Sequence, residues 1–159
     1  MDVHFSSKTN EWATPQNFFD LLDNEFNFTL DPCSTKENAK CKKFYTKEDD
    51  GLSKSWAGET VFMNPPYARE IKHWVEKAYT EVDNSRERER TIVVCLIPAR
   101  TDTRYWHEYI FGKAKEIRFV KGRLKFGDGS GSAPFPSAVV VFDSEYYGET
   151  SIKVIDKEW

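Results

Sequence analysis

The stretch that decides the fold is residues 60–98, TVFMNPPYAREIKHWVEKAYTEVDNSRERERTIVVCLIP. Its first residues, 60–63, predict a strand that stops at two prolines, and residues 70–82 carry apolar side chains at the spacing of a core-facing helix. After a charged connection, residues 91–98 form a nearly continuous apolar run, the pattern of a parallel strand buried on both faces. Strand, helix and strand in this order favour an α/β sheet.

The flanking sequence continues this alternation. We expect a helix over residues 15–26, with Thr14 as its N-cap and Pro15 in its first turn. A strand should end at Asp31, where Pro32 stops it. Further elements are expected as a short strand over 43–45, a short helix over 103–111, strands around 116–120 and over 137–142, a loop over 127–137 mobile enough to move over a ligand, and edge structure at the end of the chain.

Composition limits the class of protein. A chain of 159 residues without repeats or linkers fits a single domain, residues 1–159, that needs no disulfide or metal. No apolar run could span a bilayer and no signal peptide is apparent, so we expect a cytoplasmic protein with no membrane partner. The three cysteines lack metal-ligand spacing, and no metal is expected. The sequence leaves the oligomeric state open.

The net charge of -3 argues against coating of nucleic acid by bulk electrostatics, but a local basic face is compatible with it. Residues 113–125 are the candidate for such a face. They contain one acid, Glu116, among the cations Lys113, Lys115, Arg118, Lys121, Arg123 and Lys125. A solvated strand guarded by charges is an equally good explanation.

Chemistry is expected where the strands end, because ligands of α/β sheets bind beyond the carboxyl ends of the strands. Asp31-Pro32, Asn64-Pro65-Pro66-Tyr67 and Pro98-Ala99-Arg100 each follow such an end. The second is the strongest signal. The side-chain oxygen of Asn64 and the carbonyl of Pro65 could accept both hydrogens of an aromatic amine and free its lone pair for attack on a sulfonium methyl group.

The prolines keep this turn rigid, and Tyr67 offers a flat face for a base, where stacking contributes about 1–3 kcal/mol. Taken alone, asparagine before two prolines is also an ordinary turn starter.

The whole pattern resembles the Dam-type DNA N6-adenine methyltransferases found largely in phages and prophages. The resemblance covers about residues 12–142. It rests on Trp12–Pro15, Leu30–Cys33, Asn38–Cys41, Asp50–Leu52, Trp56, Asn64–Tyr67, Pro98–Asp102 and Ala133–Ser137.

The resemblance implies a shortened, Rossmann-like, S-adenosylmethionine-dependent methyltransferase sheet that methylates adenine N6 in double-stranded DNA, with the target base flipped into the site. Asn64, Pro65, Pro66 and Tyr67 would be catalytic. The implied cofactor-binding residues are Trp12, Thr14, Pro15, Asp31, Cys33, Asn38, Asp50 and Leu52.

Within that set, Asp31 would face the methionine amino group, Thr14-Pro15 the methionine part, and Asp50 the adenine amine. The usual glycine-rich turn after the first strand is absent, so the ribose ligand is open. Asn38 ranks ahead of Glu48 and Asp49.

DNA contacts are expected from Arg100, Arg104, Lys121, Arg123 and Phe135. Arg100 could meet a phosphate or pair with Asp102, and Phe135 could stack on a flipped base, fill the gap it leaves, or anchor its loop to the core. Two other functions are also compatible with these residues. One is the same chemistry on RNA adenine, cytosine N4 or protein glutamine, and the other is a non-catalytic nucleic-acid-binding module.

Overall fold

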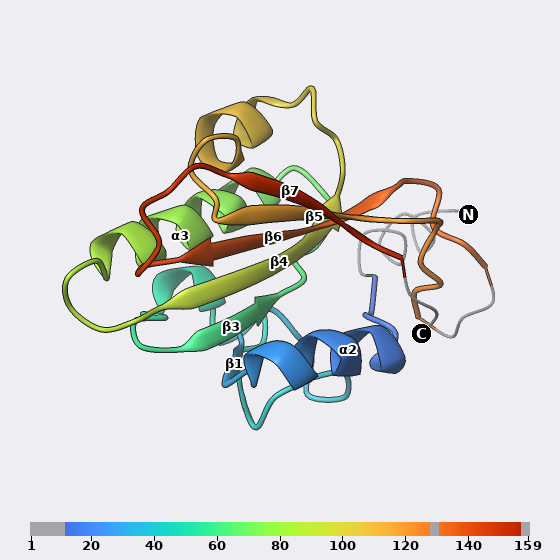
Figure 1. The fold of residues 1–159 in the computed structure, drawn as a ribbon. Helices are drawn as coiled ribbons and strands as arrows, with labels where there is room; N and C mark the ends of the chain where they lie inside the picture. Colours follow the sequence, from blue (N-terminus) through green and yellow to red (C-terminus); the bar gives the residue numbers. More distant parts are fainter. Residues whose placement is uncertain (1–11, 128–130, 157–159) are drawn as a thin grey trace.

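A seven-stranded sheet in the order β2-β1-β3-β4-β6-β5-β7 organises the computed structural model, which describes residues 12–127 and 131–156 (Figure 1). In chain order the elements are α2 (Gln16–Phe26), β1 (Leu30–Asp31), β2 (Lys43–Phe44), the 3-10 turn η1 (Gly51–Ser53), β3 (Thr60–Met63), α3 (Ile71–Asn84), β4 (Ile92–Pro98), the π-helical turn η2 (Trp106–Ile110), β5 (Glu116–Val120), β6 (Ser137–Asp143) and β7 (Ser151–Ile155).

Strand direction gathers several strand ends at one side of the sheet. The pairs β2–β1, β1–β3, β3–β4 and β5–β7 are parallel, and β6 runs antiparallel to both of its neighbours, β4 and β5. The carboxyl ends of all strands except β6 therefore lie on the same side, together with the start of β6. We call this side the carboxyl end of the sheet and the opposite side the amino end.

The core has one layer on each face of the sheet because successive strand residues point in opposite directions. Val93, Cys95 and Ile97 of β4 belong to the cluster that includes α3, whereas Val94 and Leu96 belong to the cluster that includes α2. A strand buried on both faces has to be apolar throughout, which explains the run over 91–98.

The last strand, β7, lies at the edge of the sheet, as expected from the sequence. Its Ile152 and Val154 side chains are exposed. In the described residues, 12–127 and 131–156, no helix has the length and apolar character needed to cross a membrane.

Most predicted elements are confirmed, with shifts at their ends. β3 and β5 have the expected bounds, and all five apolar residues predicted to face the core from the helix over 70–82 are buried in α3, namely Ile71, Trp74, Val75, Ala78 and Val82. The expected strand before Pro32 is only Leu30–Asp31. Residues 106–110 form a π-helical turn rather than an ordinary short helix. β4 is parallel to β3 but antiparallel to β6.

The prediction for the start of the first helix is wrong in one respect. α2 begins at Gln16, its N-cap is Pro15, and no side chain caps it. The Thr14 hydroxyl instead contacts Asn64, because tertiary contacts compete with local capping for a buried polar group. The α/β class is confirmed, and the Rossmann-like assignment stays a prediction.

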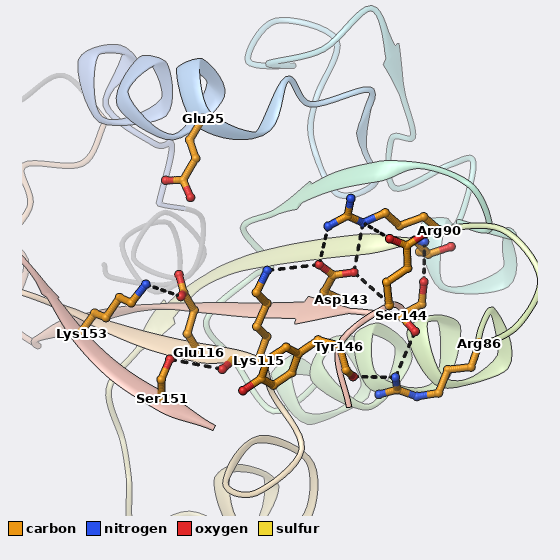
Figure 2. A network of polar contacts seen from close by, with 12 residues as sticks. Glu25, Arg86, Arg90, Lys115, Glu116, Asp143, Ser144, Tyr146, Ser151 and Lys153 are labelled. Atoms are coloured by element: carbon orange, nitrogen blue, oxygen red, sulfur yellow. Dashed lines mark hydrogen bonds and ion pairs between the residues drawn. The ribbon is translucent and has the colours of Figure 1, made fainter. Parts of the chain in front are cut away.

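A network of hydrogen bonds and ion pairs stabilises the amino end of the sheet (Figure 2). Asp143, at the end of β6, accepts hydrogen bonds from Arg90 at 2.8 Å and Lys115 at 3.4 Å. Arg86 donates to the carbonyls of Ser144 and Tyr146. Burial alone would raise the pKa of Asp143, but the bond from Arg90 and the nearby cations outweigh burial and lower that pKa. An ionised Asp143 thus joins the chain before β4, the chain before β5 and the end of β6.

Candidate functional site

Segments far apart in the sequence meet at the carboxyl end of the sheet. The thiol of Cys33 donates to the Asn64 carbonyl at 3.3 Å, which joins the turns after β1 and β3. The Gly127 amide donates to the Ala13 carbonyl at 2.9 Å, so the loop after β5 contacts the segment before α2. The turns after β1 and β3 therefore adjoin. Pro98-Ala99-Arg100 stands at the same edge of the sheet, because β4 pairs with β3 in parallel.

Asn64 has an unusual set of contacts within this site. Its amide nitrogen donates to the carbonyl of Trp12 at 2.5 Å and to the hydroxyl of Thr14 at 2.9 Å. Its side-chain oxygen is buried and accepts no hydrogen bond from the residues that the structure describes. Because an asparagine amide has two donors and one acceptor oxygen, both donors are satisfied and the acceptor is left free.

Such unsatisfied atoms are concentrated here. Of the four buried side-chain polar atoms without a partner in the described residues, three lie at the carboxyl end: Ser34 Oγ, Asn64 Oδ1 and Ser137 Oγ. A buried polar group without a partner costs about 1–3 kcal/mol, and a hydrogen bond to a polar ligand would remove that cost. The carboxyl end of the sheet is therefore the best candidate for a polar ligand site.

Asp31 supplies a carboxylate to the site. It is only 4% exposed, and burial raises its pKa to about 6. Backbone hydrogen bonds from Lys40 and Cys33 act in the opposite direction and lower that pKa, but burial has the larger effect. The bond from the Lys40 amide is 3.0 Å long. The carboxylate therefore holds the loop over 33–40, and it remains ionised at neutral pH although it is buried.

Four aromatic rings line the adjoining region. The ring of Trp12 meets Phe126 and Phe135 edge to face at 5.6 and 5.4 Å, and Tyr67 meets the same two rings at 6.1 and 5.4 Å. The Tyr67 hydroxyl donates to the Leu96 carbonyl at 2.9 Å, which fixes the ring over β4. We call Trp12, Tyr67, Phe126 and Phe135 the aromatic cluster.

The aromatic cluster bears on the alternatives for Phe135. Phe135 is 6% exposed and packed inside the cluster. It anchors its loop to the core, which is one of those alternatives, and its role toward DNA stays a prediction. Residues 128–130 of the loop over 127–137 lie outside the described residues.

The turn with Asp50 lies against the end of β1. A Cβ on Gly51 would stand 2.0 Å from the Pro32 carbonyl oxygen, so only glycine permits this approach. The indole nitrogen of Trp56 donates to the Gly51 carbonyl at 3.0 Å, and Leu52 packs on the core from this turn. Asp50 itself is exposed. The predicted adenine contact is thus close to the strand ends, but its role stays a prediction.

Asn38 is engaged in its own turn. Its side-chain oxygen accepts from the Thr35 amide at 2.7 Å, and the Thr35 hydroxyl accepts from the Asn38 amide at 3.1 Å. This reciprocal pair stabilises the loop over 33–40. A contact from Asn38 to a ribose would have to compete with the pair, and the assignment stays a prediction.

The basic stretch over 113–125 is divided between two ends of the sheet, and this is a second correction. Lys113 and Lys115 precede β5 at the amino end, where Lys115 contacts Asp143. Within β5, Arg118 forms ion pairs with Glu25 and Glu116. A strand carries its two ends to opposite sides of a sheet, so the stretch cannot form one continuous basic face.

At the carboxyl end the remaining cations stand after β5. Lys121 contacts Asp156 at 3.4 Å, Arg123 donates to the Ala133 carbonyl at 3.3 Å, and Lys125 is exposed. Arg100 is exposed with its guanidinium 5.9 Å from the centre of the Phe135 ring, and no ion pair joins it to Asp102 in the described residues. Arg104 pairs on the surface with Glu108 at 3.6 Å.

Sequence reasoning missed several participants. Lys40 bonds Asp31 through its backbone amide, Phe126 completes the aromatic cluster, and Ser34 and Ser137 carry unsatisfied hydroxyls. Position relative to a strand could have indicated Ser137, which opens β6 opposite Pro98. No group of three or more potential metal-ligating side chains occurs in residues 12–127 and 131–156.

A seven-stranded α/β sheet with this site at its carboxyl end is consistent with a methyltransferase-like fold. Residues 4–159 match the model of the family described as DNA N-6-adenine-methyltransferase (Dam). The chain therefore belongs to the DNA N-6-adenine-methyltransferase family, whose members are adenine-specific DNA methyltransferases.

Two similar proteins come from phages. The chain is 31% identical over 140 residues to the DNA N-6-adenine-methyltransferase of Haemophilus phage HP1 (strain HP1c1), a match that covers 83% of this chain and 78% of that protein. It is 29% identical over 115 residues to the DNA N-6-adenine-methyltransferase of Escherichia phage T1, covering 71% of this chain and 45% of the phage protein.

Proposed function

We propose that this protein transfers a methyl group from S-adenosylmethionine to N6 of adenine in double-stranded DNA, at a site centred on Asn64. The proposal rests on family membership and on one observation above all. The buried side-chain oxygen of Asn64 has no partner among the described residues, while its nitrogen is held by Trp12 and Thr14.

A free, buried acceptor suits an aromatic amine. The lone pair of the adenine amine is delocalised into the ring, so the nitrogen is a poor nucleophile. Asn64 Oδ1 accepts one amine hydrogen, and the Pro65 carbonyl is the candidate acceptor for the other. Both bonds favour a pyramidal nitrogen whose lone pair is free. The fixed turn holds the acceptors in place and lowers the entropic cost of alignment.

The residues fit the proposed cofactor. S-adenosylmethionine, when bound, supplies a methyl group on a positively charged sulfur that a nitrogen lone pair can attack. Asp31 is a buried carboxylate at a strand end and a suitable partner for an ammonium group. Thr14, Cys33, Leu52 and Asp50 stand around the same strand ends, so we assign them to the cofactor side with Trp12 and Pro15. The methylated nitrogen then loses its extra proton to water, and no general base is needed.

The remaining cations suit a phosphate backbone. Arg100, Arg123 and Lys125 are exposed at the carboxyl end, next to the aromatic cluster. An adenine inside a duplex cannot reach a buried acceptor, so we infer that the base is flipped. Tyr67 is the candidate stacking platform, because its ring is only partly buried and its hydroxyl is anchored.

The test is transfer of labelled methyl from S-adenosylmethionine to unmethylated duplex DNA, followed by digestion to nucleosides. We expect label in N6-methyladenosine, and a rate at least about 100-fold lower for Asn64→Ala, comparable with the loss of a preorganised hydrogen bond in other active sites. The matched control is Asn24→Ala, which removes an exposed asparagine of α2 and should retain the wild-type rate.

Other outcomes would contradict the proposal. Label in cytosine, or label in RNA or protein glutamine but not in DNA, would assign the chemistry to a different amino group. Absence of any transfer by folded protein that binds the cofactor would overturn the assignment of a reaction to this site.

A further inference from the structure

The direction of the Asn64 amide is set by the main chain of the segment before α2. The Trp12 carbonyl can only accept a hydrogen bond, so the Asn64 atom that faces it at 2.5 Å has to be the nitrogen. Rotation of the amide by half a turn would place two oxygens together. The Asn64 oxygen is thereby directed away from Trp12.

Thr14 provides the second contact. Its hydroxyl lies 2.9 Å from the Asn64 nitrogen, and the residue is 6% exposed. The hydroxyl does not cap α2, whose N-cap is Pro15. A buried hydroxyl that is not used by its own helix, and that contacts the proposed reacting residue, requires another explanation than helix initiation.

We propose that Thr14 and the Trp12 carbonyl are positioning groups for Asn64: together they hold its amide nitrogen so that its oxygen meets the amino group of the target base. This inference rests on the proposed function and deepens it. The terminal torsion of asparagine is broad and roughly two-fold, so the oxygen has a fixed direction only when both hydrogens of the nitrogen are held. Thr14 acts on the base through Asn64, beside any contact it makes with the cofactor.

The same geometry explains why an amide suits this position. An aspartate side chain has the same shape but would place a carboxylate oxygen against the Trp12 carbonyl. Two acceptors at hydrogen-bond distance repel each other. Asn64→Asp should therefore transfer methyl groups more slowly than wild type, despite keeping an acceptor of the same size.

Substitutions at Thr14 separate positioning from cofactor binding. Thr14→Val has the same shape without the hydroxyl, and Thr14→Ser keeps the hydroxyl. The control Thr150→Val removes a hydroxyl that bonds the Ala114 carbonyl at the amino end of the sheet. For Thr14→Val we expect kcat, measured at saturating cofactor so that any change in cofactor Kd does not enter, to fall roughly 10- to 100-fold. Thr14→Ser should recover kcat to within about three-fold, and Thr150→Val should match wild type.

An unchanged kcat in Thr14→Val would overturn the inference. If the cofactor Kd were weaker at that unchanged kcat, Thr14 would be a cofactor contact and nothing more.

A measurement without substrate tests the same geometry. The side-chain amide signals of Asn64, assigned by their loss in Asn64→Ala, should exchange with solvent roughly ten-fold more slowly than those of the exposed Asn24, and Thr14→Val should accelerate them. Exchange as fast as that of Asn24 in the wild-type protein would refute the positioning. If exchange is slow but DNA is not methylated, the proposed function fails and the positioning contacts stand.

Discussion

Replacement of Asp31 by asparagine should stabilise the fold at neutral pH while weakening the site. Asp31 is 4% exposed, and burial raises its pKa from 3.8 to about 6 against the opposing hydrogen bonds from the Lys40 and Cys33 amides. An ionised carboxylate that is desolvated in this way costs free energy, whereas an asparagine of the same shape never ionises.

The magnitude follows from the difference between the two pKa values. A rise of the pKa from 3.8 to about 6 corresponds to about 3 kcal/mol as an order of magnitude. Since the folded-state pKa is the higher one, the folded protein binds this proton more tightly. The contribution that proton binding at Asp31 makes to the free energy of unfolding is fully present below pH 3.8 and is lost as the pH rises through about 6. At pH 7.5, Asp31→Asn should therefore be about 1–3 kcal/mol more stable than wild type, since the amide keeps only part of the backbone hydrogen bonding.

Urea unfolding at pH 7.5 and pH 5.0 measures the effect, and Asp143→Asn serves as the contrasting variant. The pKa of Asp143 is lowered, so its contribution is present above the unfolded value of 3.8 and lost as the pH falls through the folded value. Asp143→Asn should destabilise the protein at pH 7.5, opposite in sign to Asp31→Asn. Calorimetric titration should show cofactor affinity at least about ten-fold weaker in Asp31→Asn, because the ammonium group loses a charged partner.

A loss of stability in Asp31→Asn that is equal at both pH values would refute this reasoning. It would show that Asp31 serves mainly to hold the loop over 33–40 and that its ionisation has no measurable cost.

Two further predictions concern the loops of the site. Gly51→Ala should lower the free energy of unfolding by about 3 kcal/mol in urea titrations, because its Cβ would stand 2.0 Å from the Pro32 oxygen. The control Gly131→Ala should be neutral, because no described atom lies within 4 Å of its Cβ position, and equal midpoints for the two variants would contradict the close approach. Replacing Arg123 and Lys125 together by alanine should weaken duplex binding and reduce the slope of log K against log salt by about 2. Lys113→Ala, at the amino end, should change neither quantity, and an equal effect of Lys113→Ala would argue against a DNA surface at the carboxyl end.

Periodicity was sufficient to predict the elements that are buried. α3 and β4 were predicted from their apolar patterns, because burial on one face or two imposes its own pattern on the sequence, and β3 was predicted from the strand-like run that stops at two prolines. The two shortest strands, β1 and β2, were harder to predict. β1 and β2 contain two residues each, and their pairing depends on Asp31 and on the loop that it holds more than on any strand propensity of their own.

The site was predictable in its location and only partly in its contacts. Strand ends indicated Asp31, Asn64 and Arg100, but the hydroxyl of Thr14 could equally cap a helix, and only the packing of residues 12–15 against β3 decides for Asn64. Phe135 shows the same limit, because an aromatic residue in a proline-rich loop has the same sequence pattern whether it faces a ligand or the core.

The contacts of Asn64 also bear on the order in which the chain can become active. Its nitrogen is held by Trp12, which is 52 residues earlier, and the segment that carries Trp12 is held in turn by Gly127 and the rings of Phe126 and Phe135. These are contacts of high sequence separation, which form late because a long loop must close first. We therefore expect Asn64 to gain its fixed direction only once the chain through residue 135 has been made, so that a partly synthesised protein would contain strands of the sheet without a working site.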